Sequence, residues 1–207
     1  NQFTRRTVGN GVHSGSGRTS PTSNFTDYYP LPITREALRP GTVFADPYGH
    51  ILMVADWIPQ GIGQYGVLVG ADAQPDGTIG RRRFWRGSFL FTPDTTDVGA
   101  GFKAFRPVRN AGEDRVVAVG NEELKTTVKF TAFSEEQYRG TKDDFYDRMA
   151  SLINPRPLDP FAMQTTLVEA LDESVRRRVV SVNNAVGYKR THSRPIEMPE
   201  GYSIFET

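Results

Sequence analysis

The 207-residue sequence predicts an α+β fold, with a small antiparallel sheet followed by a helical C-terminal half. Two observations carry this prediction. Short strand-like runs separated by turn residues fill the chain up to about residue 119, and helix-capping motifs with apolar residues at steps of three and four follow from residue 134. Hydrophobic residues make up 37% and aromatic residues 11% of the chain, which is enough to form a sizeable core.

The strand-like runs are short and closely spaced. The turn-forming clusters at 46–49 and 59–63 separate the first three runs, and this spacing is typical of an antiparallel meander. The predicted strands are 42–45, 50–57, 66–71, 78–91, 102–105 and 115–119.

Capping motifs mark the helices of the second half. Ser134 begins a capping-box pattern, and Thr141 is placed to cap a helix that reaches Ile153. Asp159 and Pro160 fit the N-cap and the first position of a longer helix.

This longer helix carries a single apolar stripe at steps of three and four residues. Gly187 is its predicted C-terminal end, and the basic run 176–178 is expected on its solvated side. The stripe consists of Val168, Leu171, Val175, Val179, Val182 and Val186.

Changes in composition divide the chain into four segments. Residues 1–27 form a flexible Gly/Ser-rich arm, 28–133 an antiparallel β-rich core, 134–190 a helical region and 191–207 an extended tail. Because the sequence begins with Asn1 and not with Met, we expect a longer precursor chain.

The charges and the residue types disfavour several classes of function. The net charge is only +1, which argues against nucleic acid as a partner. There is no apolar run of about 20 residues, so no membrane span is expected. The chain has no cysteine, and its three histidines show no metal-ligand spacing, so neither a metal nor a cofactor is expected.

His50 is the best candidate for a catalytic residue. It follows the tight turn 46–49 and precedes the run 51–55, which is apolar on both faces. A histidine at the edge of a buried strand is held firmly and is partly desolvated, which suits a general base that works near neutral pH.

The expected antiparallel neighbour of this strand is the run 66–72. In that pairing, Asp72 or Gln74 is placed to hydrogen-bond the imidazole of His50 and fix its tautomer. Asp46 and Asp56 are alternative partners.

The segment Pro-Gly-Thr-Val-Phe-Ala-Asp-Pro-Tyr-Gly-His-Ile-Leu-Met-Val resembles the histidine segment of papain-like cysteine hydrolases of the NlpC cell-wall peptidase type. In that family, Gly-His precedes an apolar strand, and the histidine accepts the proton of a cysteine that lies earlier in the chain. A polar residue on the next strand orients the histidine. The resemblance covers residues 39–74 and implies that His50 is the base and that Asp72 or Gln74 is the third catalytic residue.

The resemblance also implies a substrate and a location. The substrate would be a peptide or glycopeptide of the bacterial cell wall, cleaved at an amide bond, and the protein would be secreted or in the cell envelope. The chain departs from the family because it lacks the cysteine, so the nucleophile would lie outside these residues, in the remainder of the precursor.

A basic and aromatic segment at 81–86 indicates an alternative function. Arginine planes and tryptophan rings stack on sugars or bases, so Arg83 and Trp85, together with Tyr48 near the histidine, are candidate substrate-binding residues. A strand with solvated arginines accounts for the same pattern. The alternative is therefore a non-catalytic binding or structural module for a glycan or a protein surface, including a degenerate hydrolase.

Overall fold

The computed structural model describes residue 2 and residues 17–192, apart from residues 25, 74–78, 95–98, 113 and 158. The chain divides into two compact units, residues 1–156 and 157–207. The first unit contains a six-stranded antiparallel sheet with short helices, and the second contains one long helix. The α+β prediction is therefore confirmed.

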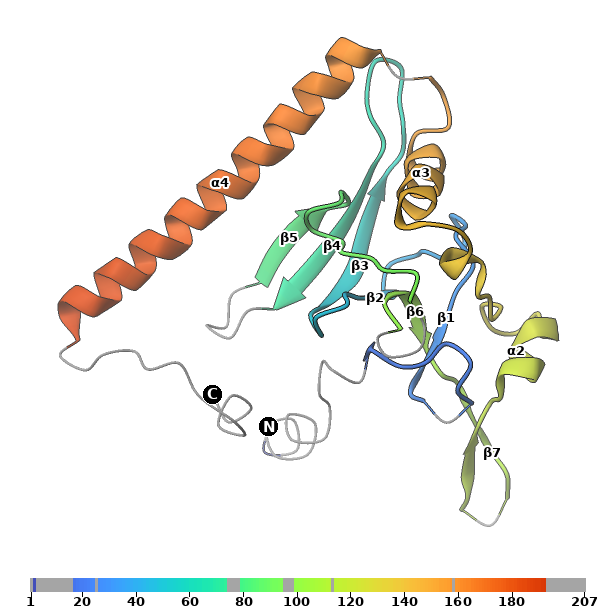
Figure 1. The fold of residues 1–207 in the computed structure, drawn as a ribbon. Coiled ribbons are helices and arrows are strands. Elements are labelled where there is room, and N and C mark those ends of the chain that lie inside the picture. Colours follow the sequence, from blue (N-terminus) through green and yellow to red (C-terminus); the bar gives the residue numbers. More distant parts are fainter. Residues whose placement is uncertain are drawn as a thin grey trace. The chain divides into compact units, whose positions relative to one another are not determined.

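The six strands lie in the order β1-β6-β2-β3-β4-β5, and all neighbours are antiparallel (Figure 1). Strands β2 to β5 form the predicted meander, whereas β6 returns to the free side of β2 and also pairs with β1. The strands are β1 (Tyr28–Pro30), β2 (Val43–Ala45), β3 (Ile51–Ile58), β4 (Val67–Ala73), β5 (Ile79–Arg83) and β6 (Gly101–Phe105). A separate hairpin joins β7 (Val108–Asn110) to β8 (Val116–Ala118).

Strand β3 is buried on one face only. Leu52, Val54 and Trp57 are buried, whereas Met53 and Ile58 are about half-exposed. A β-bulge between Val54 and Asp56 shifts the alternation by one residue. The run 51–55 is thus apolar on both faces but buried on only one of them.

The predicted strand 78–91 is also too long, because β5 ends at Arg83. A turn follows, in which the backbone N–H groups of Ser88 and Phe89 donate to the carbonyl of Trp85 at 3.1 and 3.0 Å. The turn brings Phe84 and Phe89 onto the core. The aromatic residues that led to the strand prediction thus belong to a loop that packs on the sheet.

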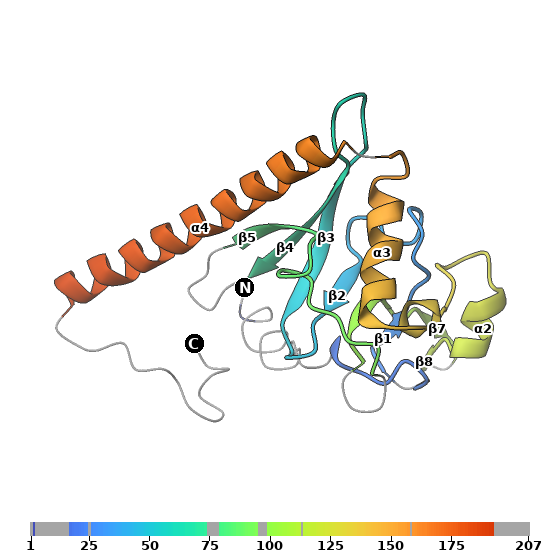
Figure 2. The same cartoon turned by 45° about the horizontal axis from the view of Figure 1, so that its top comes forward.

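Helix α3 (Lys142–Ile153) covers the core face of the sheet (Figure 2). Its predicted start is confirmed, because the Thr141 hydroxyl accepts from the Asp144 N–H and Asp144 completes a capping box. Its phenylalanine Phe145 stacks on Phe91 with ring centroids 3.8 Å apart. The largest buried side chains of this core are Phe44, Phe89, Phe91, Phe102, Phe145, Leu52 and Leu68.

The described part of the first unit also contains two short helical segments. The capping box predicted at Ser134 was wrong, because the segment there is only the 3-10 turn η3 (Glu136–Tyr138), its N-cap is Glu135 without a side-chain cap, and the Ser134 hydroxyl accepts from the Glu136 N–H at 3.2 Å. Helix α2 (Asn121–Thr126), which the sequence did not predict, packs Leu124 into a second small core.

Part of the N-terminal arm lies on the sheet. The buried ammonium of Lys103 on β6 donates to the carbonyls of Gly17 and Thr19 at 2.5 and 3.0 Å and to the Thr19 hydroxyl at 3.3 Å. The guanidinium of Arg106 donates to the carbonyls of Ser23 and Thr26 at 3.0 and 2.7 Å. We call residues 17–24 and Thr26 the strap. Burial lowers the pKa of Lys103 to about 7.

In the described part of the second unit, the secondary structure is α4 (Pro160–Thr191), capped by Asp159 as predicted. The prediction that it ends at Gly187 was wrong, because the helix continues for one more turn, in which His192 N–H donates to the Tyr188 carbonyl at 3.0 Å. None of the helices in the described part of the chain is long and apolar enough to span a membrane. The predicted tail lies outside the described residues from 193 onward.

Candidate functional site

His50 lies at the end of the β2–β3 hairpin, in a turn that its own backbone closes. The Asp46 N–H donates to the His50 carbonyl at 2.9 Å. The Asp46 carboxylate in turn accepts from the N–H groups of Tyr48 and His50 at 2.8 and 2.9 Å. Gly49 takes a φ of +99°, a conformation that favours glycine. Asp46 therefore orients the backbone of the turn and does not bond to the imidazole.

The imidazole instead meets Asp72, the predicted residue on β4. His50 Nε2 lies 3.0 Å from Asp72 Oδ2. The His50 side chain is 41% exposed and that of Asp72 only 1% exposed. The other alternative partner, Asp56, accepts from the N–H of Trp57. The two residues that the strand pairing brings together are therefore His50 and Asp72, and Gln74 lies outside the described residues.

This contact determines which ring nitrogen is available. A carboxylate only accepts hydrogen bonds, so Nε2 of neutral His50 carries the proton, and this N–H group donates a hydrogen bond to Asp72. Nδ1 then holds the lone pair, and in the described part of the chain no hydrogen bond to it is recorded. The geometry thus leaves one ring nitrogen as a proton acceptor on a half-exposed side chain.

Arg82 on β5 is the third member of the cluster, and sequence analysis did not single it out. Its Nε and one terminal nitrogen both lie 2.9 Å from Asp72 Oδ2, the oxygen that also faces His50. The signal was present in the alternation along the strand, because Gly80 and Arg82 lie on the same face of the sheet as Asp72, whereas Arg81 and Arg83 point to the opposite face. Arg82 compensates the charge of the buried carboxylate.

Gly80 makes room for this carboxylate. It pairs directly with Asp72 across β4 and β5. A Cβ atom at position 80 would lie 2.2 Å from Asp72 Oδ1, far inside van der Waals contact. Any larger residue at 80 would therefore displace Asp72 from His50.

The candidate substrate-binding residues do not gather around His50. Tyr48 is 80% exposed in the same turn, two residues before the histidine. Arg83 pairs with Val69, three residues along β4 from Asp72, and faces away from it. Trp85 is 41% exposed in the turn that follows β5. Tyr48 thus shares the turn of His50, and Arg83 shares β5 with Arg82 but points to the opposite face of the sheet.

The strap passes the turn that carries His50. A Cβ atom added to Gly17 would lie 2.7 Å from the Ile51 side chain, and one added to Gly49 would lie 3.3 Å from Arg18 Nε. The main chain of Gly17 and the side chain of Arg18 are therefore in close contact with the residues on either side of the histidine.

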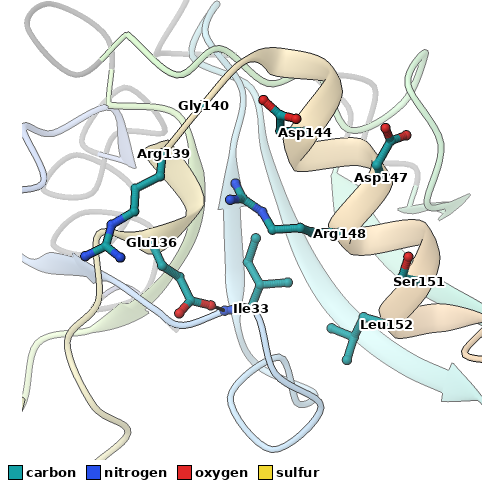
Figure 3. Close-up of a pocket in the computed structure, with 9 residues that line it drawn as sticks. All are labelled: Ile33, Glu136, Arg139, Gly140, Asp144, Asp147, Arg148, Ser151 and Leu152. Carbon is teal, nitrogen blue, oxygen red and sulfur yellow. Dashed lines mark hydrogen bonds between the residues drawn. The ribbon is translucent and has the colours of Figure 1, made fainter.

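A surface hollow of the first unit lies elsewhere, between η3 and α3 (Figure 3). Two of its charged groups already have structural partners, since Glu136 accepts from the Ile33 N–H at 2.7 Å and Arg148 donates to the Gln137 carbonyl at 3.1 Å. His50, Asp72 and Arg82 do not line it. Among the described residues, no group of three or more His, Cys, Asp or Glu side chains is placed to hold a metal ion.

The site therefore consists of a half-exposed imidazole, a buried carboxylate and a guanidinium at one end of the core face. Such a cluster can accept and return a proton at His50 Nδ1 without losing its fixed geometry. Comparison with protein-family models, with curated proteins and with solved structures finds no significant match.

Proposed function

We propose that this chain is part of a papain-like cysteine hydrolase that cleaves an amide bond, with His50 as general base and Asp72 as its orienting partner. One observation carries the proposal. The Nε2 atom of a half-exposed histidine lies 3.0 Å from a carboxylate that is almost fully buried on the neighbouring strand. This is the relation between base and orienting residue that nucleophilic hydrolases require.

In this reaction, His50 Nδ1 takes the proton of a thiol, and the thiolate attacks the carbonyl carbon of the amide. The C–N bond then breaks as the imidazolium returns the proton to the departing amine. Water hydrolyses the thioester, with His50 again acting as base, and the thiol is restored. The 207 residues contain no cysteine, so the proposal places the thiol outside them.

Asp72 and Arg82 have separate parts in this proposal. Asp72 fixes the tautomer and stabilises the imidazolium that forms during the reaction. Arg82 shares Asp72 Oδ2 with the imidazole and holds the carboxylate in place. The proposed substrate, a peptide or glycopeptide of the bacterial cell wall, follows from the family resemblance. In this proposal, Tyr48, which is exposed in the turn of His50, binds the substrate beside the base.

The test is amide hydrolysis of cell-wall peptide by the complete polypeptide that contains this sequence. We expect His50→Ala to lower kcat/KM by about 100-fold to 10,000-fold, because proton transfer contributes that much to such reactions. His192→Ala, at the end of α4, is the matched control and should leave the rate unchanged.

Thiol-alkylating reagent should abolish the same activity. Hydrolysis that survives both His50→Ala and alkylation would contradict the proposal, and so would a complete polypeptide that has no cysteine.

A second candidate is a binding module that retains the geometry without the reaction. Asp72 Oδ2 contacts both Arg82 and His50, as an oxygen does in an ion network that only stabilises the fold. This arrangement favours the binding module. In that case, the 207-residue protein should bind cell-wall material without cleaving it, and a Trp85→Ala or Tyr48→Ala substitution should weaken the binding measured by co-sedimentation.

A further inference from the structure

Helix α4 has an apolar stripe that no other described residue of the second unit covers. None of its described side chains is buried, and the six stripe residues are 42–59% exposed. They repeat at 11 residues, as the pairs Val168 and Val179, Leu171 and Val182, and Val175 and Val186 show. An 11-residue repeat corresponds to 3.67 residues per turn, so the stripe runs almost parallel to the helix axis. Such a stripe fits a long, straight partner.

The charges of the helix are separated along its length. Residues 159–173 contain four acidic residues and no basic one, and residues 174–192 contain five basic residues and no acidic one. The acidic residues are Asp159, Glu169, Asp172 and Glu173, and the basic ones are Arg176, Arg177, Arg178, Lys189 and Arg190. The helix is therefore complementary to itself only when it is turned end for end.

We propose that α4 is a dimerisation helix that pairs antiparallel with α4 of a second copy of this chain. The two stripes bury one another, and the acidic half of each copy lies beside the basic half of the other. A parallel pair would bring Arg176–Arg178 of both copies together, and likewise Lys189 and Arg190, so like charges oppose that arrangement.

The stripe and the charges set the register. A pair centred near Ser174 places Phe161 of one copy opposite Val186 of the other, and this is the alignment with the longest apolar overlap. The overlap from 161 to 186 spans about 39 Å of helix. In the same register, Asp172 on one side of the stripe faces Arg176 of the second copy, and the two-fold axis repeats the contact.

The ion pairs within the helix are consistent with this pairing. Arg176 Nε lies 2.7 Å from Asp172 Oδ2 of the same helix, and Arg177 contacts Glu173. In the dimer, the first pair would meet its symmetry mate and form a network of four charges. A helix that lies on a membrane surface is expected to be basic along its whole polar face, whereas the first half of α4 is acidic.

The first experiment measures the oligomeric state of the 207-residue protein by sedimentation equilibrium. Val175→Asp introduces two carboxylates at the centre of the interface and should raise the dimer dissociation constant at least 100-fold. Val180→Asp is the matched control, because Val180 is about as exposed but lies off the stripe, and it should change the constant less than threefold. Circular dichroism checks that α4 stays helical in both variants.

The second experiment determines the direction of pairing and uses the absence of native cysteine. Phe161→Cys and Val186→Cys proteins of different tag length are mixed and oxidised. An antiparallel pair yields chiefly the mixed disulfide, whereas a parallel pair yields chiefly the two homodimers.

Three outcomes would overturn the proposal. One is a monomer at all concentrations, in which case the stripe is covered by something other than a second copy. The others are a predominance of the two homodisulfides, or binding of the wild type to anionic vesicles without self-association.

Discussion

Two charged clusters on the same sheet bury their charges in opposite ways. Where β3 begins and β4 ends, the buried carboxylate of Asp72 contacts two partly exposed side chains. Arg82 is positively charged, and His50 can be neutral or positively charged. On β6, the hydrogen bonds that the buried Lys103 makes to described residues all go to neutral oxygens of the strap. In the first cluster, which we call the open cluster, the buried charge faces an opposite charge and the partner side chains reach solvent. In the second, which we call the closed cluster, the buried charge faces no opposite charge among the described residues.

This difference separates a site suited to chemistry from one suited to holding the chain. The open cluster can change its protonation at His50 Nδ1 while the bonds of Asp72 stay in place. In the closed cluster, the charge of Lys103 is opposed by burial, which lowers its pKa to about 7. A change in protonation there alters the free energy of folding and the attachment of the strap.

The largest effect is expected from Lys103→Met, measured as the pH dependence of unfolding. The folded-state pKa of about 7 lies below the ordinary value of 10.5, so unfolding takes up a proton between these values. The free energy of unfolding of the wild type should therefore rise with pH, by about 3 kcal/mol between pH 7 and 9.5. The variant should lose this slope.

The measurement is urea unfolding at several pH values, and the window stops at pH 9.5 for a reason. Burial raises the pKa of Tyr28 and Tyr138 in the folded state, so their ionisation on unfolding lowers stability above about pH 10. Proteolysis within residues 17–24 should also become faster in the variant. If Lys103→Met kept the wild-type slope, Lys103 would hold its proton throughout this pH range. Burial of its charge would then not make stability depend on pH, and the contrast with the open cluster would fail.

A smaller effect is expected from Gly80→Ala, which perturbs the open cluster without removing any of its members. The new Cβ atom would lie 2.2 Å from Asp72 Oδ1 and would push the carboxylate away from the imidazole. We expect a loss of about 2 kcal/mol in unfolding free energy, as is usual for an overpacked site. Nitrogen-15 chemical shifts of His50 should then lose the preference for the Nε2–H tautomer.

Gly187→Ala is the matched control, because a Cβ atom there meets nothing within 4 Å. It should leave unfolding of the first unit unchanged. If Gly80→Ala also left the free energy of unfolding unchanged, the Asp72 carboxylate would not be held in the position that the structure gives it.

The sequence was sufficient for features that depend on local patterns. The strands around His50 and the capping of α3 by Thr141 follow from turn residues and capping motifs that lie within a few residues of each other. For the partner of the imidazole, the expected strand pairing left four candidates, of which the structure places Asp72 at 3.0 Å. Long-range pairing was not accessible in this way. The insertion of β6 between β1 and β2 joins segments about 60 residues apart, and nothing in the local pattern of β6 specifies its partners.

The two charged residues that were missed show the same limit. Arg82 was hidden in a run of three arginines, where only the partner strand shows which one faces the carboxylate. Lys103 is a single lysine in an apolar strand, and its acceptors in the strap lie 84 and 86 residues away. A buried cation of this kind becomes visible only when the whole sheet is assembled.

The smallest effect is expected from Thr19→Val, which removes one acceptor of Lys103 and keeps the shape of the side chain. The hydroxyl is the longest of the three contacts, at 3.3 Å, and the carbonyls of Gly17 and Thr19 remain. The free energy of unfolding should fall by about 1 kcal/mol, the usual contribution of one hydrogen bond. The pH slope set by Lys103 should persist, because backbone oxygens still surround the ammonium. If the variant instead lost the slope, the hydroxyl and not the backbone would determine how the strap holds the buried charge, and the closed cluster would depend on a side chain, as the open one does.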